Sequence, residues 1–215
     1  MRVEVKVCGL TRPEDARDAA LFGARYVGAV FAAGPRALDA ARARTVLDGA
    51  GEGVERVGVF GHAQPEEVAA AVRAARLDIA QLHADPSASD VRAARAASGA
   101  KIWAVVRVNG SLRAGDLRAL WEVADAVVLD SKVGGKLGGT GAPFDWEAAR
   151  DAAQEHRAPL VVAGGLTAEN VARAIAALAP TVVDVSSGVE SSPGIKDRAS
   201  MSDFISAVRR AENER

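Results

Sequence analysis

The chain alternates short runs rich in β-branched residues with longer segments of helical period that are rich in Ala and Arg, and it does so eight times. Strands that regularly alternate with helices predict a parallel sheet whose strands are joined by crossover helices. We therefore expect an α/β fold. The predicted strands are Val3–Cys8, Tyr26–Phe31, Arg56–Phe60, Asp78–His83, Lys101–Val108, Ala126–Asp130, Leu160–Ala163 and Val182–Ser186.

Two folds share this alternation, the open doubly wound sheet and the closed (β/α)8 barrel. An open sheet that binds a dinucleotide usually has G-x-G-x-x-G after its first strand, whereas this chain has Cys8-Gly9-Leu10-Thr11. Eight units favour the barrel, and 215 residues lie near the lower end of the roughly 200 to more than 400 that such barrels contain. Because no linker or low-complexity segment divides the chain, we predict a single-domain TIM barrel over residues 1–215.

The overall charge excludes some classes of partner. With 27 basic and 28 acidic residues, the chain has no excess of charge that favours nucleic acid or an anionic membrane. No segment approaches the ~18 uninterrupted apolar residues of a membrane span, and the first ten residues are typical of a strand rather than of a signal peptide. We expect a cytoplasmic enzyme without a nucleic-acid or membrane partner. The oligomeric state stays open, with a monomer favoured over a homodimer.

Helix starts and faces support the assignment. Thr11–Glu14 and Ser87–Asp90 have the spacing of capping boxes. The predicted third helix has one apolar stripe, as expected for a helix that packs on a sheet. This stripe contains Val68, Ala71, Val72 and Ala75.

Alternation along the first strand decides where Cys8, the only cysteine, points. If Val3, Val5 and Val7 face the helices, then Lys6 and Cys8 face the barrel interior, with Cys8 at its carboxyl end. A single cysteine excludes an internal disulfide and a cysteine-cluster metal site. Catalytic groups in barrels stand at the carboxyl ends of strands, so Cys8 is a candidate catalytic group. The alternative is a small buried side chain that only fills space.

The same parity directs polar side chains from three further strands to the same end of the barrel. Asp130 ends its strand before a glycine-rich loop, and its alternative role is a helix cap or a surface carboxylate. The others either contact a substrate or belong to a structural polar network. They are Gln81, His83, Asp184 and Ser186.

Two late loops are rich in glycine and small hydroxyl residues. Glycine lets backbone N–H groups approach an anion, and phosphate sites in barrels recur after strands seven and eight. We predict a phosphate site here, the alternative being ordinary tight turns. A third stretch, residues 134–141, is either a lid or a loop without function. The predicted phosphate-binding residues are Gly141, Gly164, Gly165, Ser186, Ser187 and Gly188.

An ordered set of short motifs spans nearly the whole chain and resembles the phosphoribosylanthranilate isomerase family of tryptophan biosynthesis. These motifs are Lys6-Val7-Cys8-Gly9-Leu10-Thr11, Gln81-Leu82-His83, Leu129-Asp130-Ser131-Lys132, Gly139-Thr140-Gly141 with Phe144-Asp145-Trp146, Ala163-Gly164-Gly165-Leu166, Asp184-Val185-Ser186-Ser187-Gly188-Val189-Glu190, Pro193-Gly194 and Lys196-Asp197.

The resemblance implies an aldose–ketose isomerase, which is an intramolecular oxidoreductase, acting on a phosphosugar by a cofactor-free and metal-free Amadori rearrangement. It implies that Cys8 is the general base and Asp130 the general acid, and it places Arg36 against the anthranilate carboxylate. The chemistry requires a carboxyl that stays protonated near neutral pH, which the apolar neighbour Val128 favours, and a thiolate, which Lys6 favours.

Three other functions agree in part with the sequence. The histidine-pathway isomerase performs the same rearrangement but has an Asp in place of Cys8. It also needs a second phosphate site in the first half of the barrel, and the residues after the second, third and fourth predicted strands offer no glycine-rich candidate. A metal-dependent pentose-phosphate epimerase needs more ligands than His62, His83 and His156 provide. A non-catalytic phosphosugar-binding barrel would not need both Cys8 and Asp130.

Overall fold

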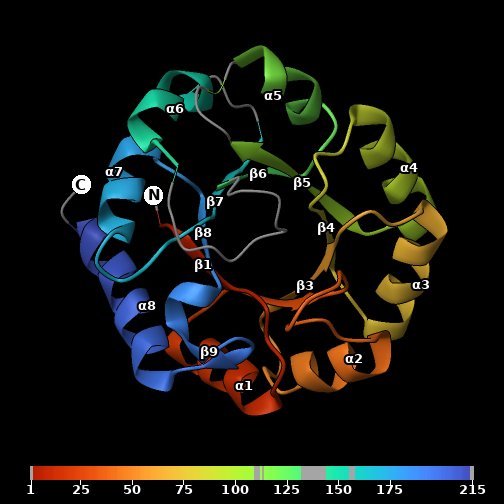
Figure 1. Cartoon of the computed structure of the whole chain (residues 1–215), viewed down its shortest axis with the longest axis horizontal. Helices are drawn as coiled ribbons and strands as arrows, with labels where there is room; N and C mark the ends of the chain where they lie inside the picture. Colours follow the sequence, from red (N-terminus) through yellow and green to blue (C-terminus); the bar gives the residue numbers. More distant parts are fainter. Residues whose placement is uncertain (1, 109–111, 113, 132–143, 155–157, 214–215) are drawn as a thin grey trace.

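The computed structural model describes residues 2–108, 112, 114–131, 144–154 and 158–213. Eight parallel strands close into a barrel in chain order, with β1 paired to β8, and the helices surround it (Figure 1). The predicted TIM barrel is confirmed. The strands are β1 (Glu4–Val7), β2 (Tyr26–Val30), β3 (Glu55–Phe60), β4 (Ile79–Leu82), β5 (Lys101–Val108), β6 (Ala126–Ser131), β7 (Leu160–Val162) and β8 (Val182–Val185).

The helices follow the strands as predicted, although one predicted cap is wrong. Ser87 and Asp90 form the expected capping box. At the first helix, however, the N-cap is Arg12 without a side-chain cap bond, because the Thr11 hydroxyl donates instead to the Gly194 carbonyl. The helices are α1 (Pro13–Phe22), α2 (Ala40–Asp48), α3 (Pro65–Ala75), α4 (Ala88–Ser98), α5 (Ala114–Trp121), α6 (Trp146–Gln154), α7 (Val171–Leu178) and α8 (Arg198–Asn213).

The apolar side chains form two layers. One layer lies between the strands and the helices, and it includes Val3, Val5 and Val7 of the first strand region as predicted. The other fills the barrel interior, where Trp103 and Val128 are buried. Because the valines of β1 face outward, Lys6 and Cys8 face inward, and this parity delivers polar groups to the barrel mouth.

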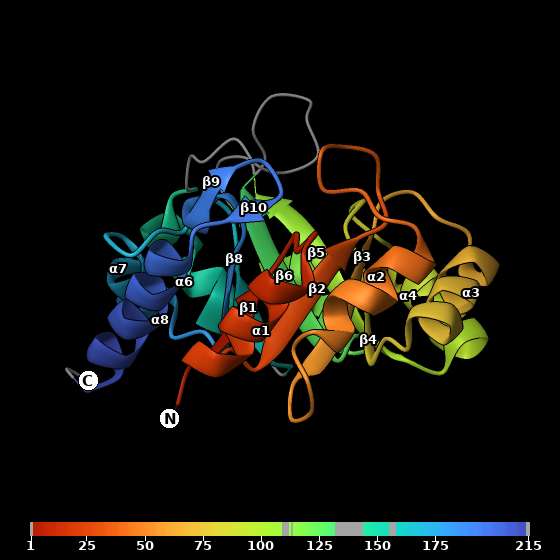
Figure 2. The same cartoon turned by 90° about the horizontal axis from the view of Figure 1, so that it is seen from below.

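A short antiparallel hairpin, absent from the predicted elements, stands between β8 and α8. It follows a 3-10 helix, η1 (Ser187–Val189), and consists of β9 (Glu190–Ser192) and β10 (Ile195–Lys196). Figure 2 shows the hairpin at the end of the barrel opposite the two chain termini. This is the end at which the barrel strands finish. Among the described residues, no helix combines the length and apolar character needed to cross a bilayer.

Candidate active site

A cavity of about 510 Å³ opens at the carboxyl ends of the strands. Of the residues predicted to form the site, all but Gly141 line it, and Gly141 lies outside the described residues. A smaller cavity of about 230 Å³ beside His62 contains none of them. The predicted site residues that line the larger cavity are Cys8, Arg36, Gln81, His83, Asp130, Gly164, Gly165, Asp184, Ser186, Ser187 and Gly188.

Cys8 directly follows β1 and is 8% exposed. Its backbone N–H donates to the Val185 carbonyl at 2.8 Å, which continues the pairing of the first and last strands beyond β1. The neighbouring position on β2 is Gly28, where an added Cβ would lie 3.2 Å from Cys8 Sγ, so the glycine leaves room for the thiol.

As expected, the charge of Lys6 lowers the pKa of the Cys8 thiol, but it is not the largest influence on that pKa. Burial raises the pKa of Cys8, and the charge of Lys6 offsets this only in part. Lys6 forms an ion pair with Asp184, at 2.6 Å from Nζ to Oδ2, with no exposed lysine side-chain surface. The Asp184 carboxylate itself raises the pKa of Cys8.

Asp130 lies near the end of β6 and is 9% exposed. Burial raises its pKa to about 6, and the nearby charge of Asp184 adds to the shift. The predicted effect of the apolar barrel wall is therefore confirmed in direction. A carboxyl with this pKa keeps a proton closer to neutral pH than a solvated aspartate does, and it can act as a general acid.

Gln81 lies on β4 and His83 directly follows this strand, and both line the cavity. Burial, followed by the charge of Lys6, lowers the pKa of His83 to about 4, so its imidazole is neutral near pH 7. Three buried polar atoms of the cavity residues have no hydrogen-bond partner among the described residues. They are Gln81 Oε1, His83 Nδ1 and Asp184 Oδ1. Unpaired polar atoms at the wall of a cavity are positioned to bind the hydroxyl groups of a ligand.

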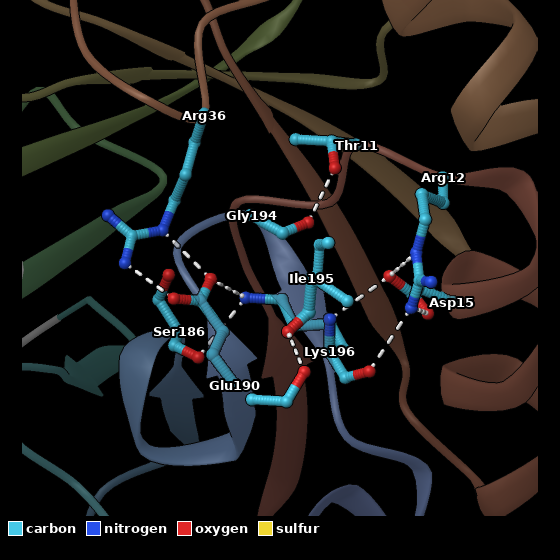
Figure 3. Close-up of polar contacts among 10 residues, drawn as sticks. Thr11, Arg12, Asp15, Arg36, Ser186, Glu190, Gly194, Ile195 and Lys196 are labelled. Atoms are coloured by element: carbon cyan, nitrogen blue, oxygen red, sulfur yellow. Dashed lines mark hydrogen bonds and ion pairs between the residues drawn. The ribbon is translucent and has the colours of Figure 1, made fainter.

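Arg36, from the loop after β2, does not stand alone. Glu190 accepts hydrogen bonds from Arg36 Nε at 2.8 Å and from Nη2 at 2.6 Å, and it also accepts one from Lys196 Nζ at 2.7 Å (Figure 3). Glu190 and Lys196 were not predicted as site residues. The Pro193-Gly194 turn signal, which lies between them in the sequence, is the local feature from which this hairpin could have been predicted.

The two glycine-rich loops meet at the same end of the barrel. Gly164 and Gly165 have positive φ angles of 83° and 67°. Their N–H groups donate to no acceptor among the described residues, and such groups can bind an anion. A Cβ on Gly188 would lie 1.9 Å from the carbonyl oxygen of Leu166, so the two loops touch only because this residue is glycine.

Taken together, the cavity contains a carboxyl with a raised pKa, a thiol, a guanidinium and two loops suited to an anion. A model of the family described as N-(5'phosphoribosyl)anthranilate (PRA) isomerase matches residues 5–207. The chain belongs to this family. The resemblance seen in the sequence motifs is confirmed, and the protein is an isomerase.

Relatives in this family match over nearly their full length. A protein named N-(5'-phosphoribosyl)anthranilate isomerase from Acidithiobacillus ferrooxidans is 45% identical over 211 residues, which cover 96% of this chain and 98% of that protein. One of the same name from Rubrobacter xylanophilus is 42% identical over 212 residues, covering 96% of this chain and 98% of that protein.

Solved structures of PRA isomerases share the fold. The phosphoribosyl anthranilate isomerase of Thermotoga maritima superposes with a TM-score of 0.85 at 32% identity, covering 97% of this chain and 99% of that one. Another PRA isomerase structure, solved in complex with reduced 1-(o-carboxyphenylamino)-1-deoxyribulose 5-phosphate, has a TM-score of 0.82 at 31% identity, with coverage of 97% and 99%.

Proposed function

We propose that this PRA isomerase converts N-(5'-phosphoribosyl)anthranilate to 1-(2-carboxyphenylamino)-1-deoxyribulose 5-phosphate in tryptophan biosynthesis, by acid–base catalysis. The reaction is an aldose–ketose isomerisation, in which C2 of the sugar is oxidised as C1 is reduced, and it needs no external oxidant. The observation that carries the proposal is that Cys8 and Asp130 line one cavity together with the two glycine-rich loops.

Asp130 acts as the general acid. It donates its proton to the furanose ring oxygen, the bond from this oxygen to C1 breaks, and the nitrogen lone pair forms a protonated Schiff base with C1. Its raised pKa of about 6 supports this role, because a useful fraction of the carboxyl is protonated near neutral pH.

Cys8 acts as the general base. Its thiolate removes the proton from C2, the electron pair forms the C1–C2 double bond, and the C–N π electrons return to nitrogen to give an enolamine. Tautomerisation then moves the enol proton from O2 to C1 and leaves a ketone at C2, so the reaction gains and loses no atoms. Solvent takes the proton from Cys8 and returns one to Asp130.

The remaining cavity residues bind the ends of the substrate. The phosphate lies against the loops of Gly164–Gly165 and Ser186–Gly188, with Gly141 as a predicted further contact, and Arg36 binds the anthranilate carboxylate. The unpaired oxygen and nitrogen atoms of Gln81, His83 and Asp184 receive the sugar hydroxyls. Binding at both ends holds C1 and C2 between acid and base, which raises the rate by fixing the reacting atoms.

A fluorescence assay tests this function. N-(5'-phosphoribosyl)anthranilate is made in place from anthranilate, and its loss is followed with the purified protein, with the histidine-pathway substrate in a parallel reaction. We expect consumption of the first substrate and none of the second. No consumption of the first would overturn the proposal.

Two further expectations accompany this function. We expect a cytoplasmic enzyme and a monomer, and light scattering coupled to gel filtration measures the second. A Thermotoga maritima relative is described as dimeric, so a dimer mass for this chain would contradict the expectation.

A further inference from the structure

Three charged groups form one network at the edge of the cavity: the buried side chains of Glu190 and Lys196 and the half-buried side chain of Arg36. Glu190 accepts hydrogen bonds from Arg36 and from Lys196, its side chain is 4% exposed, and the Lys196 side chain has no exposed surface (Figure 3). Burial raises the pKa of Glu190, but the hydrogen bonds from Arg36 and Lys196 outweigh burial and hold this pKa below its usual value. Burial lowers the pKa of Lys196, and the ion pair with Glu190 opposes this change. With Lys196 Nζ 2.7 Å from Glu190 Oε1, we take the network as one anion and two cations.

Glu190 binds one edge of the planar Arg36 guanidinium. A second edge, formed by the two terminal nitrogens, is available to a ligand. A guanidinium is planar and has five N–H donors, and it can bind one carboxylate along its Nε edge and another across its two terminal nitrogens. Glu190 occupies the Nε and Nη2 edge. Both N–H groups of Nη1 and the second of Nη2 donate to none of the residues that the structure describes, and they form the edge that a second carboxylate binds.

Lys196 changes the charge that such a carboxylate meets. Arg36 and Glu190 alone would be a neutral pair, and an incoming carboxylate would compete with Glu190 for the same cation. Because Lys196 Nζ lies 2.7 Å from Glu190 Oε1, the three groups together carry a net charge of +1. A net positive charge away from water attracts a carboxylate more strongly than a neutral pair does.

The hairpin holds this arrangement in place before any ligand arrives. The Lys196 N–H donates to Asp15 Oδ2 at 3.1 Å, and its carbonyl accepts from Arg12 Nη2 at 3.2 Å. Its Nζ also donates to the Ser186 carbonyl at 3.1 Å, beside the predicted phosphate site. Figure 3 shows these contacts on both sides of the hairpin. Groups fixed in this way bind a ligand without a cost for ordering their own side chains.

We propose that Glu190 and Lys196 are positioning residues for recognition of the substrate's aromatic carboxylate: Glu190 fixes the plane of Arg36, and Lys196 neutralises Glu190 so that the charge of Arg36 remains available. This inference rests on the proposed function, because it takes the anthranilate carboxylate as the ligand of Arg36. It adds to that function a pair of residues that determine specificity for a carboxylated aromatic ring.

The test uses calorimetric binding of two stable ligands to the full chain. One is reduced 1-(o-carboxyphenylamino)-1-deoxyribulose 5-phosphate, and the other is its counterpart without the carboxyl group. We expect Lys196→Met to weaken the first by about tenfold or more, the scale of a charge-assisted hydrogen bond, and the second by less than about twofold. Lys101→Met is the matched control. It removes an exposed lysine at the first residue of β5, at the end of the barrel away from the cavity, and should leave both affinities unchanged.

A double variant separates this role from a merely structural one. Adding Glu190→Gln to Lys196→Met removes the uncompensated carboxylate that competes for Arg36, so we expect the affinity for the carboxylated ligand to recover by about threefold or more. Equal weakening of both ligands by Lys196→Met, or no recovery in the double variant, would overturn the inference.

Two controls keep the result interpretable. If Lys196→Met does not fold, Lys196→Gln keeps a donor to Glu190 without the charge and must show the same loss of discrimination between the ligands; an unchanged ratio would contradict the inference. Lys196 also acts on the pKa of Cys8, so binding rather than turnover is measured. Turnover by the unmodified protein tests the proposed function separately, and no turnover would overturn that function. The ratio of the affinities for the two ligands tests only the roles of Glu190 and Lys196.

Discussion

Nε2 of His83 lies 3.4 Å from Oδ2 of Asp130 at the mouth of the barrel. The burial that lowers the pKa of the imidazole to about 4 also raises the pKa of the carboxyl to about 6. Between these two values the histidine is already neutral while the aspartate still holds its proton. His83 therefore does not stabilise a carboxylate at Asp130 by charge, which favours the protonated form required by the proposed role of Asp130 as general acid.

The Asp130→Asn variant should be more stable than the unmodified protein near pH 8. The folded-state pKa of Asp130, about 6, lies above the ordinary value of 3.8. The contribution that the protonated carboxyl makes to stability is therefore complete below about pH 4 and is lost as the pH rises through 6. We expect Asp130→Asn to raise the free energy of unfolding by about 2 kcal/mol near pH 8 and by far less near pH 4. Urea unfolding at both pH values measures this, and a gain that does not depend on pH would contradict it.

The Cys8 thiol should titrate above the ordinary cysteine pKa of about 8.5. Burial raises this pKa more than Lys6 lowers it. The ultraviolet absorbance of the thiolate reports the titration directly, because Cys8 is the only cysteine, and Cys8→Ala supplies the baseline. A midpoint at or below the ordinary value would show that Lys6 outweighs burial after all.

Removing either proposed catalytic group should lower kcat without unfolding the protein. We expect Cys8→Ala and Asp130→Asn to lose at least about 100-fold in kcat, the usual effect of deleting a general base or acid. Arg36→Ala should mainly raise KM, since it acts on binding. Steady-state kinetics separate the two effects, with circular dichroism as the check on folding. Near-normal turnover by Cys8→Ala would remove its assignment as the base.

Gly164→Ala should disturb the site more than the fold. A Cβ at this position would lie 2.6 Å from Asp130 Oδ1 and 2.5 Å from the Ser131 nitrogen. Gly99 is the matched control, because its φ of 70° is also positive but a Cβ there meets nothing within 4 Å. Both substitutions should cost about 1 kcal/mol of backbone strain, whereas only Gly164→Ala should lose activity. Equal activity of the two variants would show that the Asp130 carboxyl tolerates the displacement.

The barrel and the direction of its candidate catalytic side chains could be predicted because both depend on local periodicity. Alternation in the first strand was enough to predict that Cys8 points toward the cavity and Val7 away from it, because neighbouring side chains of a strand point to opposite faces. The glycine-rich loops could be assigned to one end of the barrel because parallel strands all finish there.

The charge partners could not be predicted, because they come from residues far apart in the chain. Glu190 contacts Arg36 across 154 positions, and Asp184 contacts Lys6 across 178. The error at Thr11 has the same origin, since its hydroxyl binds the hairpin carbonyl of Gly194 instead of capping its own helix. The sign of the Cys8 pKa shift is decided mainly by burial, which outweighs the charge of Lys6, and the Asp184 carboxylate paired with Lys6 raises the pKa further.

The position of the β9–β10 hairpin near the end of the chain has a consequence for synthesis. Arg36 is made early, but Glu190 and Lys196 emerge from the ribosome only after all eight barrel strands. Asp15 and Arg12 can therefore bind the Lys196 backbone only after this last segment has been made, and the network of Arg36, Glu190 and Lys196 is complete only then. A nascent chain that ends before the hairpin could contain every barrel strand with Cys8, Arg36 and Asp130, yet it would lack the two residues proposed to position Arg36.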